Sequence, residues 1–321
     1  MRKIIFLGIL LLIIAGLLSL ILFRGRSPFG KSNSSFASEP QKEITKIEFS
    51  DGEKKLRLEK EGEGWLLNGK SETRKGGILF IQRVLQEIKI KSPVSAELFE
   101  NEITAKNISA IKVRVYEKRK LLKSFLVYKT SSNIYGNIMK IRGGSKPFIV
   151  YVPGFEGDIG SAFTFNELYW QPYNVFNLLP SEIAAVTFEN ISDTSASFSI
   201  INKNQQYFVS DLNKNLTGWD SSLVSRYISY FTWIPFESWA FELGEEEKKK
   251  VESQRPLYRI SVTTTSGSKT VLTLWERMTD KNDTKDSDRL FGKTESRDVL
   301  FIMRYFDIDP LIKKRSYFFP E

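Results

Sequence analysis

An uninterrupted apolar stretch near the amino terminus limits where this chain can reside. Ile4 to Phe23 is a run of twenty residues without a charged side chain, and basic residues flank it on both sides. A helix of that length rises about 30 Å, which matches the hydrocarbon thickness of a bilayer. We therefore predict that residues 1–23 form a transmembrane anchor with a short cytoplasmic head.

A cleavable signal peptide is the main alternative to a permanent anchor. Such a signal has an apolar stretch of about 7–15 residues with a small-x-small cleavage site close behind it. Here the stretch is longer, Arg24 and Arg26 follow it directly, and the first small pair, Ser35 and Ala37, lies well beyond its end. Long domains translocate largely regardless of charge. We predict a single-pass protein of the cytoplasmic (inner) membrane, with its soluble domain on the periplasmic or extracytoplasmic side.

The distribution of charge argues against a nucleic-acid partner. The net charge is +9, but five of the 47 basic residues flank the apolar run, so 42 basic residues face 38 acidic ones in the soluble part. That balance is typical of an ordinary solvated surface, because no long basic run is interleaved with aromatic residues. The basic excess beside the bilayer suits anionic lipid headgroups.

The chain contains no cysteine and no histidine. This excludes Ser-His-Asp and Cys-His nucleophiles, histidine or thiolate metal sites, and disulfides. Neither a Walker-type phosphate loop nor a dinucleotide-binding glycine motif occurs in the sequence. Carboxylate-only catalysis, Ser-Lys catalysis and an oxygen-ligated metal stay open. We assign no catalytic residue, no cofactor, no metal ligand and no small-molecule substrate.

The soluble part begins with a polar segment and a β-rich unit. Residues 24–42 are rich in Ser, Gly and Pro, which predicts a flexible tether. Alternating apolar residues then predict a three-strand meander at the start of a first unit over residues 43–160. Apolar residues at spacings of three and four predict an amphipathic helix within 76–90. Four further strands are expected over residues 111–116, 121–128, 134–141 and 148–152.

The same order of patterns recurs in the second half of the chain. Residues 182–188 resemble residues 43–49, and an amphipathic helix is expected around residues 223–231. We predict an α+β fold of mostly antiparallel sheet, with two similar meander–helix–strand units of about 140 residues that arose by internal duplication. The second unit covers residues 182–321. Chance similarity between short alternating strands is the alternative.

Aromatic residues gather in two places. Residues 161–181 form an aromatic connector that includes Tyr169, Trp170 and Tyr173, and a second group includes Trp233 and Trp239. Large aromatic side chains at a junction can form an interdomain core, or they can form a partner-binding surface. We take these five as the candidate partner-binding residues and leave the packing interpretation open.

Two acidic segments are weak candidates for chemistry. Residues 280–288 have the oxygen density of a calcium loop, but Lys285 and Phe291 stand where an EF-hand needs glycine and glutamate. A solvated hairpin loop explains that segment better. Asp307 and Asp309 are paired by spacing, but Pro310 follows them, which favours a polar turn.

The opening of the soluble part resembles a known family. The stretch ITKIEF, followed by LRLEKEGEGWLL with its Gly-Trp pair and an amphipathic helix, is similar to the family called domain of unknown function 4340. The resemblance covers most of residues 43–320. It implies a membrane-anchored envelope protein, and some members look associated with ABC-transporter-like or gliding-type machinery. It implies no catalytic residue. Many members have an acidic residue before the first helix, where this chain has Arg74-Lys75-Gly76-Gly77.

These observations favour a non-catalytic envelope protein that docks a protein partner. The alternative is a carboxylate-dependent hydrolase acting on cell-envelope glycans. A deep cleft with two carboxylates about 5–10 Å apart, one with a raised pKa, would favour the hydrolase. A flat or aromatic-lined groove would favour docking.

Overall fold

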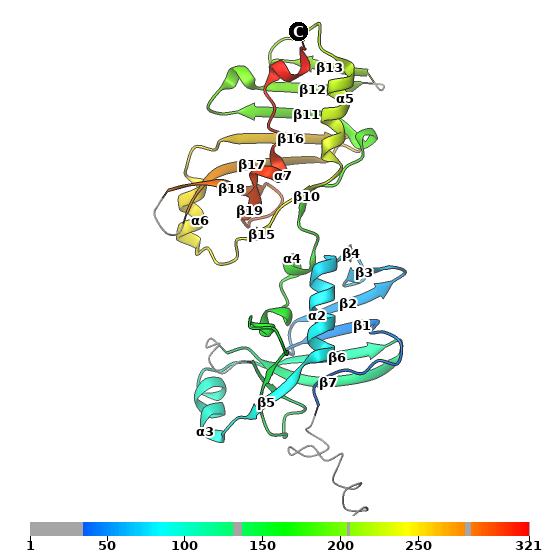
Figure 1. Ribbon diagram of the computed structural model, residues 1–321, viewed down its shortest axis with the longest axis vertical. Helices are drawn as coiled ribbons and strands as arrows, with labels where there is room; N and C mark the ends of the chain where they lie inside the picture. The colour runs from blue at the N-terminus through cyan, green and yellow to red at the C-terminus, as the bar shows by residue number, and fades with distance from the viewer. Residues whose placement is uncertain (1–34, 131–136, 204–205, 280–283, 321) are drawn as a thin grey trace, which may run out of the picture. The chain divides into compact units, whose positions relative to one another are not determined.

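The chain divides into two compact units, Met1–Pro172 and Tyr173–Glu321 (Figure 1). The computed structural model describes residues 35–130, 137–203, 206–279 and 284–320. Each unit contains one large antiparallel sheet and a few short helices, which confirms the α+β class. Within those ranges no helix has the length and apolar character needed to cross a bilayer. The predicted anchor, residues 1–23, lies outside them.

A nine-stranded antiparallel sheet forms the first unit, in the order β4-β3-β2-β1-β6-β7-β8-β9-β5. The strands are β1 (Lys46–Ser50), β2 (Lys55–Glu61), β3 (Gly64–Leu67), β4 (Ser71–Glu72), β5 (Lys89–Pro93), β6 (Ile111–Glu117), β7 (Lys120–Tyr128), β8 (Asn137–Lys140) and β9 (Phe148–Tyr151). Their alternating side chains give the sheet an inner apolar face and an outer polar face.

Helix α2 (Lys75–Glu87) covers the inner face of this sheet. Ile78, Ile81 and Leu85 are buried in one cluster with Ile47 and Phe49 of β1. The helix ends at Glu87. The backbone is no longer helical at Ile88, and the chain continues as edge strand β5 from Lys89. The helix predicted within residues 76–90 is therefore confirmed, but it ends at Glu87, earlier than predicted.

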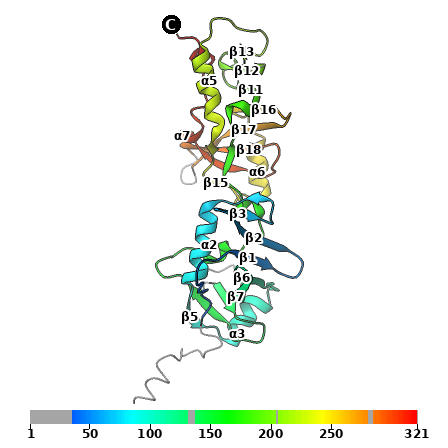
Figure 2. The ribbon, with the colours of Figure 1, turned by 90° about the vertical axis from the view of Figure 1, so that its right-hand side faces the viewer.

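In the part of the chain that the structure describes, helical segments cover the outer face at the β8–β9 end of the sheet. There α3 (Ala96–Phe99) and the π-helical turn η1 (Glu100–Thr104) pack over Ile138, which is fully buried. Figure 2 shows α2 and α3 on opposite sides of the sheet. The outer face of β2, β1 and β6 carries polar side chains.

The segment that leads into β1 is part of the core, so the predicted tether ends earlier than residue 42. Phe36 is buried and meets the ring of Phe125 edge-on at 5.9 Å. The backbone N–H of Ser38 donates to the carbonyl of Leu85 at 2.7 Å. The polar composition of this segment predicts a tether. The free energy gained by burying the Phe36 side chain instead fixes the segment to the core.

An eight-stranded antiparallel sheet forms the second unit, in the order β13-β12-β11-β16-β17-β18-β19-β15. The strands are β11 (Ile183–Asn190), β12 (Phe198–Lys203), β13 (Gln206–Ser210), β15 (Ser238–Trp239), β16 (Tyr258–Thr264), β17 (Lys269–Met278), β18 (Lys285–Thr294) and β19 (Phe301–Arg304). A separate pair joins β10 (Asn174–Phe176) to β14 (Ile234–Pro235).

Two helices lie against this second sheet. Helix α5 (Ser221–Ser229) buries Tyr227, whose ring meets Phe198 of β12 edge-on at 5.3 Å. Helix α6 (Glu245–Glu252) packs through Val251 against Trp275 of β17 on the outer face. The remaining turns are η4 (Pro180–Glu182), η5 (Thr194–Ala196), η6 (Tyr230–Thr232), α7 (Tyr305–Ile308) and η7 (Arg315–Phe318).

The predicted aromatic connector does not exist as a separate element. Its first part contains η3 (Ile159–Ala162) and α4 (Glu167–Trp170), which pack in the first unit. From Tyr173 onward the chain belongs to the second unit, where β10 pairs with β14. The boundary therefore lies between Pro172 and Tyr173, because the aromatic residues on either side are buried in different cores.

Candidate binding surfaces

Trp170 is a core residue of the first unit. Its side chain is fully buried and stacks on Phe49 with ring centroids 5.8 Å apart. The indole N–H donates to the carbonyl of Thr164 at 3.0 Å. Tyr169 beside it is partly buried and meets Trp170 edge-on at 4.9 Å. Burial places Trp170 out of reach of a partner, so its role is packing.

Tyr173 and Trp239 pack together in the second unit. Tyr173 stacks on Phe236 at 5.2 Å and meets Trp239 edge-on at 6.3 Å. Trp239 is buried, and it also contacts Phe301 at 5.9 Å. The guanidinium of Arg297 lies 5.3 Å from the Trp239 ring centroid, which closes the cluster with a cation–π contact. Trp239 is therefore a packing residue as well.

Trp233 is the most exposed of the five candidate residues, with 54 % of its surface accessible. It lies between η6 and β14, and the next residue, Ile234, points into the core. Helix α7, which packs against β14, carries Phe306 with 84 % of its surface accessible. The Trp233 side chain is therefore accessible to a partner.

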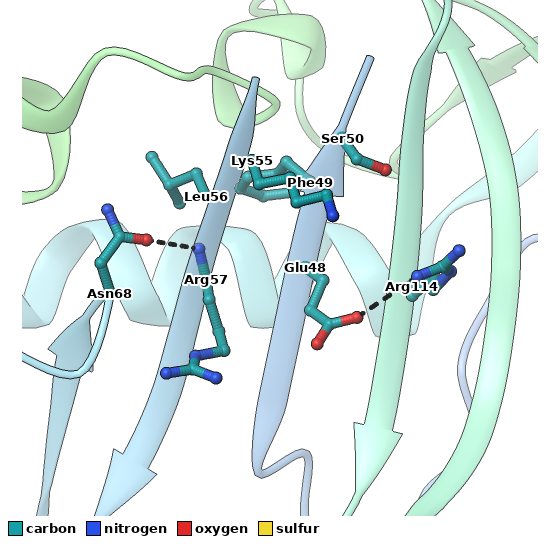
Figure 3. A pocket seen from close by; sticks show the side chains of 8 residues that line it. All are labelled: Glu48, Phe49, Ser50, Lys55, Leu56, Arg57, Asn68 and Arg114. Carbon is teal, nitrogen blue, oxygen red and sulfur yellow. Dashed lines mark hydrogen bonds and ion pairs between the residues drawn. The ribbon is translucent and has the colours of Figure 1, made fainter. Parts of the chain in front are cut away.

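A shallow hollow of about 400 Å³ lies on the outer face of the first sheet (Figure 3). The strand register places Glu48 of β1 directly between Arg57 of β2 and Arg114 of β6. Figure 3 shows the Glu48 carboxylate directed toward Arg114, with Lys55 and Asn68 at the margin. Three of these five side chains are cationic and one is anionic, so the hollow has a positive excess.

The Glu48 carboxylate is held by three neighbours. The Tyr116 hydroxyl donates to it at 2.9 Å, and the Lys46 ammonium lies 3.2 Å from it. Arg114 lies 3.7 Å away. Burial alone raises the pKa of Glu48, but these hydrogen bonds and charges outweigh burial and hold the pKa below its usual value. The group is therefore an ion at neutral pH and a poor proton donor.

The backbone of Arg57 is fixed by Asn68, which follows β3. The Arg57 N–H donates to the Asn68 side-chain oxygen at 2.9 Å, and the Asn68 N–H donates to the Arg57 carbonyl at 2.7 Å. Asn68 adopts φ +53°, a conformation that asparagine tolerates better than most residues. The Arg57 guanidinium pairs with Glu59 at 3.2 Å, and both side chains stay nearly half exposed.

The corresponding positions of the second sheet carry hydroxyl groups. Thr187 of β11 lies between Ser199 of β12 and Ser261 of β16. The hydroxyls of Thr187 and Ser199 are 3.1 Å apart. The two outer faces therefore share a strand arrangement and differ in charge.

The acidic candidates from the sequence are engaged by local cations. Arg304 donates to Asp307 at 2.8 and 3.1 Å, and Lys313 donates to Asp309 at 3.1 Å. Part of the acidic segment 280–288 lies outside the described residues. Among the residues that are described, no group of three or more acidic side chains is arranged to hold a metal ion.

A second hollow, of about 330 Å³, lies beside α6. Three carboxylates, those of Glu252, Glu295 and Asp298, line it. Asp298 bridges Lys248 and Lys293, each at 2.8 Å. These hydrogen bonds lower the pKa of Asp298 to about 2. The two lysines therefore stabilise the ionised form of Asp298, which makes this carboxyl group a poor general acid.

The sequence contained a signal for the charged hollow that motif reasoning missed. Glu48, Arg57 and Arg114 each stand between two buried apolar residues of a strand. That alternation predicts an outward side chain. It does not say which strands are neighbours, so the three residues could not be brought together from the sequence.

Comparison of the chain with protein-family models, with curated proteins and with solved structures returned no match. The class that fold and surfaces define is a two-unit antiparallel β protein with a charged hollow on the first sheet and an exposed tryptophan in the second unit.

Proposed function

We propose that this is a non-catalytic, membrane-anchored envelope protein that docks a protein partner within a transporter-like or gliding-type complex. Residues 1–23 anchor it in the cytoplasmic membrane, and both units lie on the extracytoplasmic side. The observation that carries the proposal is the charged hollow around Glu48. Its side chains are accessible, and the strand register fixes their spacing.

The chemistry of the hollow suits an acidic patch on a folded partner. Arg57 and Arg114 present planar guanidinium groups on either side of Glu48. Such groups bind carboxylates with two parallel hydrogen bonds, and they can exchange an intramolecular carboxylate for a partner's carboxylate. Complementary charges of this kind speed association and select the partner.

The hydrolase alternative has less support. A glycan hydrolase needs a carboxyl group with a raised pKa as its general acid. The carboxyl groups with shifted pKa values that line the two hollows, Glu48 and Asp298, are both shifted downward. Glu48 is held by a tyrosine hydroxyl, Lys46 and Arg114, which favour its ionised form and not the protonated form that a general acid needs.

We also propose that the two units arose by internal duplication. The strand order β3-β2-β1-β6-β7-β8-β9-β5 in one sheet corresponds to β13-β12-β11-β16-β17-β18-β19-β15 in the other. The main helix α2 comes after β3 and the two-residue strand β4, the main helix α5 comes after β13, and a short helix follows the edge strand of each sheet. The leading segments support the same relation. Ser38 donates its N–H to Leu85 near the end of α2, and Leu178 donates its N–H to Phe231, just after α5.

Site-specific crosslinking from intact membranes tests the docking proposal. A photo-crosslinking side chain at Lys55, on the rim of the hollow, should capture a specific protein, and one at Lys269 of the second sheet should not. Replacing Arg57 and Arg114 by glutamine should reduce capture at Lys55 with little change in the melting temperature, since exposed ion pairs contribute little to stability.

Two results would contradict the proposal. One is capture at Lys55 that does not depend on Arg57 and Arg114. The other is an Asp307→Asn or Asp309→Asn variant that loses function while its fold, abundance and partner capture stay unchanged, because that outcome indicates catalysis.

A further inference from the structure

We propose that the tip of the β6–β7 hairpin docks on an anionic lipid surface and holds the first unit against the membrane. This inference rests on the proposed amino-terminal anchor. Four consecutive residues form the contact: Lys118 and Arg119 at the turn, and Lys120 and Leu121 at the start of β7.

The tip combines positive charge with an exposed apolar side chain. Lys118, Arg119 and Lys120 are all exposed, and Leu121 has 50 % of its surface accessible. Lys118 adopts φ +51°, as the tight turn between the two strands requires. Clustered basic residues are attracted to anionic headgroups, and a leucine at the same level can enter the boundary between headgroups and acyl chains.

The chain that arrives from the proposed anchor is fastened to this same hairpin. The Lys123 ammonium donates to the carbonyl of Ser35 at 3.1 Å. The backbone N–H groups of Gln41 and Lys42 donate to the Glu117 carboxylate at 3.2 and 2.8 Å. The Lys118 N–H donates to the Thr45 hydroxyl at 2.6 Å. The dark blue segment beside β6 and β7 in Figure 1 is this leading chain.

The length of the connection limits how far the hairpin can move from the bilayer. Residues 24–34 separate the proposed anchor from Ser35, and a chain of that length spans at most about 40 Å when fully extended. Arg119 lies four residues from Lys123, or about 13 Å along a strand. The tip therefore stays at a high effective concentration near the lipid surface, so a weak contact suffices to hold it there.

The hairpin at the same place in the second sheet supports this assignment. Strands β16 and β17 are joined through Thr265, Ser266, Gly267 and Ser268, where β6 and β7 are joined through basic residues. Ser266 and Ser268 are exposed, as the basic residues are. Of these two described hairpins, the one on the unit that follows the proposed anchor has the basic tip, and the second hairpin provides a matched control.

Because the chain contains no cysteine, a single engineered cysteine reports on one position. The full chain with Leu121→Cys, carrying a polarity-sensitive fluorophore, is reconstituted into vesicles of phosphatidylcholine or of equal parts phosphatidylcholine and phosphatidylglycerol. We expect a several-fold fall in accessibility to a water-soluble quencher in the anionic vesicles, reversed by high salt. A label at Ser266→Cys should stay accessible in both.

Neutralising the tip separates lipid docking from other contacts. Lys118→Asn, Arg119→Gln and Lys120→Gln in the Leu121→Cys background should restore accessibility, and asparagine tolerates the positive φ at 118. A Leu121 label that stays accessible in anionic vesicles overturns the proposal while the anchor stands. A label at position 121 that stays shielded from the quencher in neutral vesicles, or after the three basic residues are replaced, indicates that it contacts protein and not lipid. That result also overturns the proposal. If the full chain fails to float with either vesicle, the anchor and the docking that depends on it both fail.

Discussion

At the scale of single residues, environment separates side chains of the same type. Trp170 is fully buried between Phe49 and Tyr169, whereas Trp233 is more than half exposed. The same indole therefore stabilises a core in one position and is accessible to a partner in the other. Two substitutions to alanine measure this difference directly.

Trp170→Ala should destabilise the first unit by about 3–5 kcal/mol, because it removes buried apolar surface and leaves a cavity. Trp233→Ala should change stability by less than about 0.5 kcal/mol, as exposed substitutions do. Urea denaturation of the full chain in detergent, followed by tryptophan fluorescence, checks both. Equal losses for the two variants would contradict the assignment of Trp170 to the core.

Glu48 should make stability depend on pH. Its pKa is lower in the folded protein than in the unfolded chain, so its contribution is present above the unfolded pKa and is lost as the pH falls through the folded one. Glu48→Gln should be less stable than the native protein by under about 1 kcal/mol at pH 7. The difference should vanish in acid. A difference that stays constant down to pH 3 would contradict this account.

At the scale of elements, the two main helices begin differently. Helix α5 is capped by Asp220, whose side chain accepts from the N–H groups of Ser222 and Leu223 at 2.7 and 3.3 Å. Helix α2 has no side-chain cap and no acidic residue in its first turn, where Lys75 is exposed. A positive charge at this end opposes the helix dipole.

Lys75→Glu should therefore stabilise the first unit, by about 0.3–1 kcal/mol at low salt. The gain should shrink as ionic strength rises, because screening weakens a surface charge. Urea midpoints at two salt concentrations check the prediction, with Lys89→Glu on edge strand β5 as the control. A gain in stability that does not change with salt concentration, or that equals the gain of the Lys89→Glu control, would indicate a cause other than the helix dipole.

At the scale of the whole molecule, the prediction concerns topology. A reporter active only outside the cytoplasm, fused after Glu321, should be active, because the anchor is expected to leave its short head inside. A reporter active only in the cytoplasm should be silent at the same position. Activity of the second reporter alone would reverse the location of both units and remove the proposed envelope role.

Several elements could be predicted from the sequence because their periodicity is local. The alternation within residues 111–116 and 121–128 identified β6 and β7, and the spacing of Ile78, Ile81 and Leu85 identified α2. The end of α2 and the polar tether were mispredicted. Burial of Ile88 and Phe36 depends on surfaces contributed by distant strands, which local composition does not report.

The sequence by itself determined the α+β class, the absence of thiol and imidazole chemistry, and the outward direction of Glu48, Arg57 and Arg114. These follow from residue type and from a period of two along a strand. Only the tertiary structure decided that those three residues are neighbours and that Trp170 is buried. The physical reason is that strand pairing and core packing join residues far apart in the chain, and their register depends on the whole sheet.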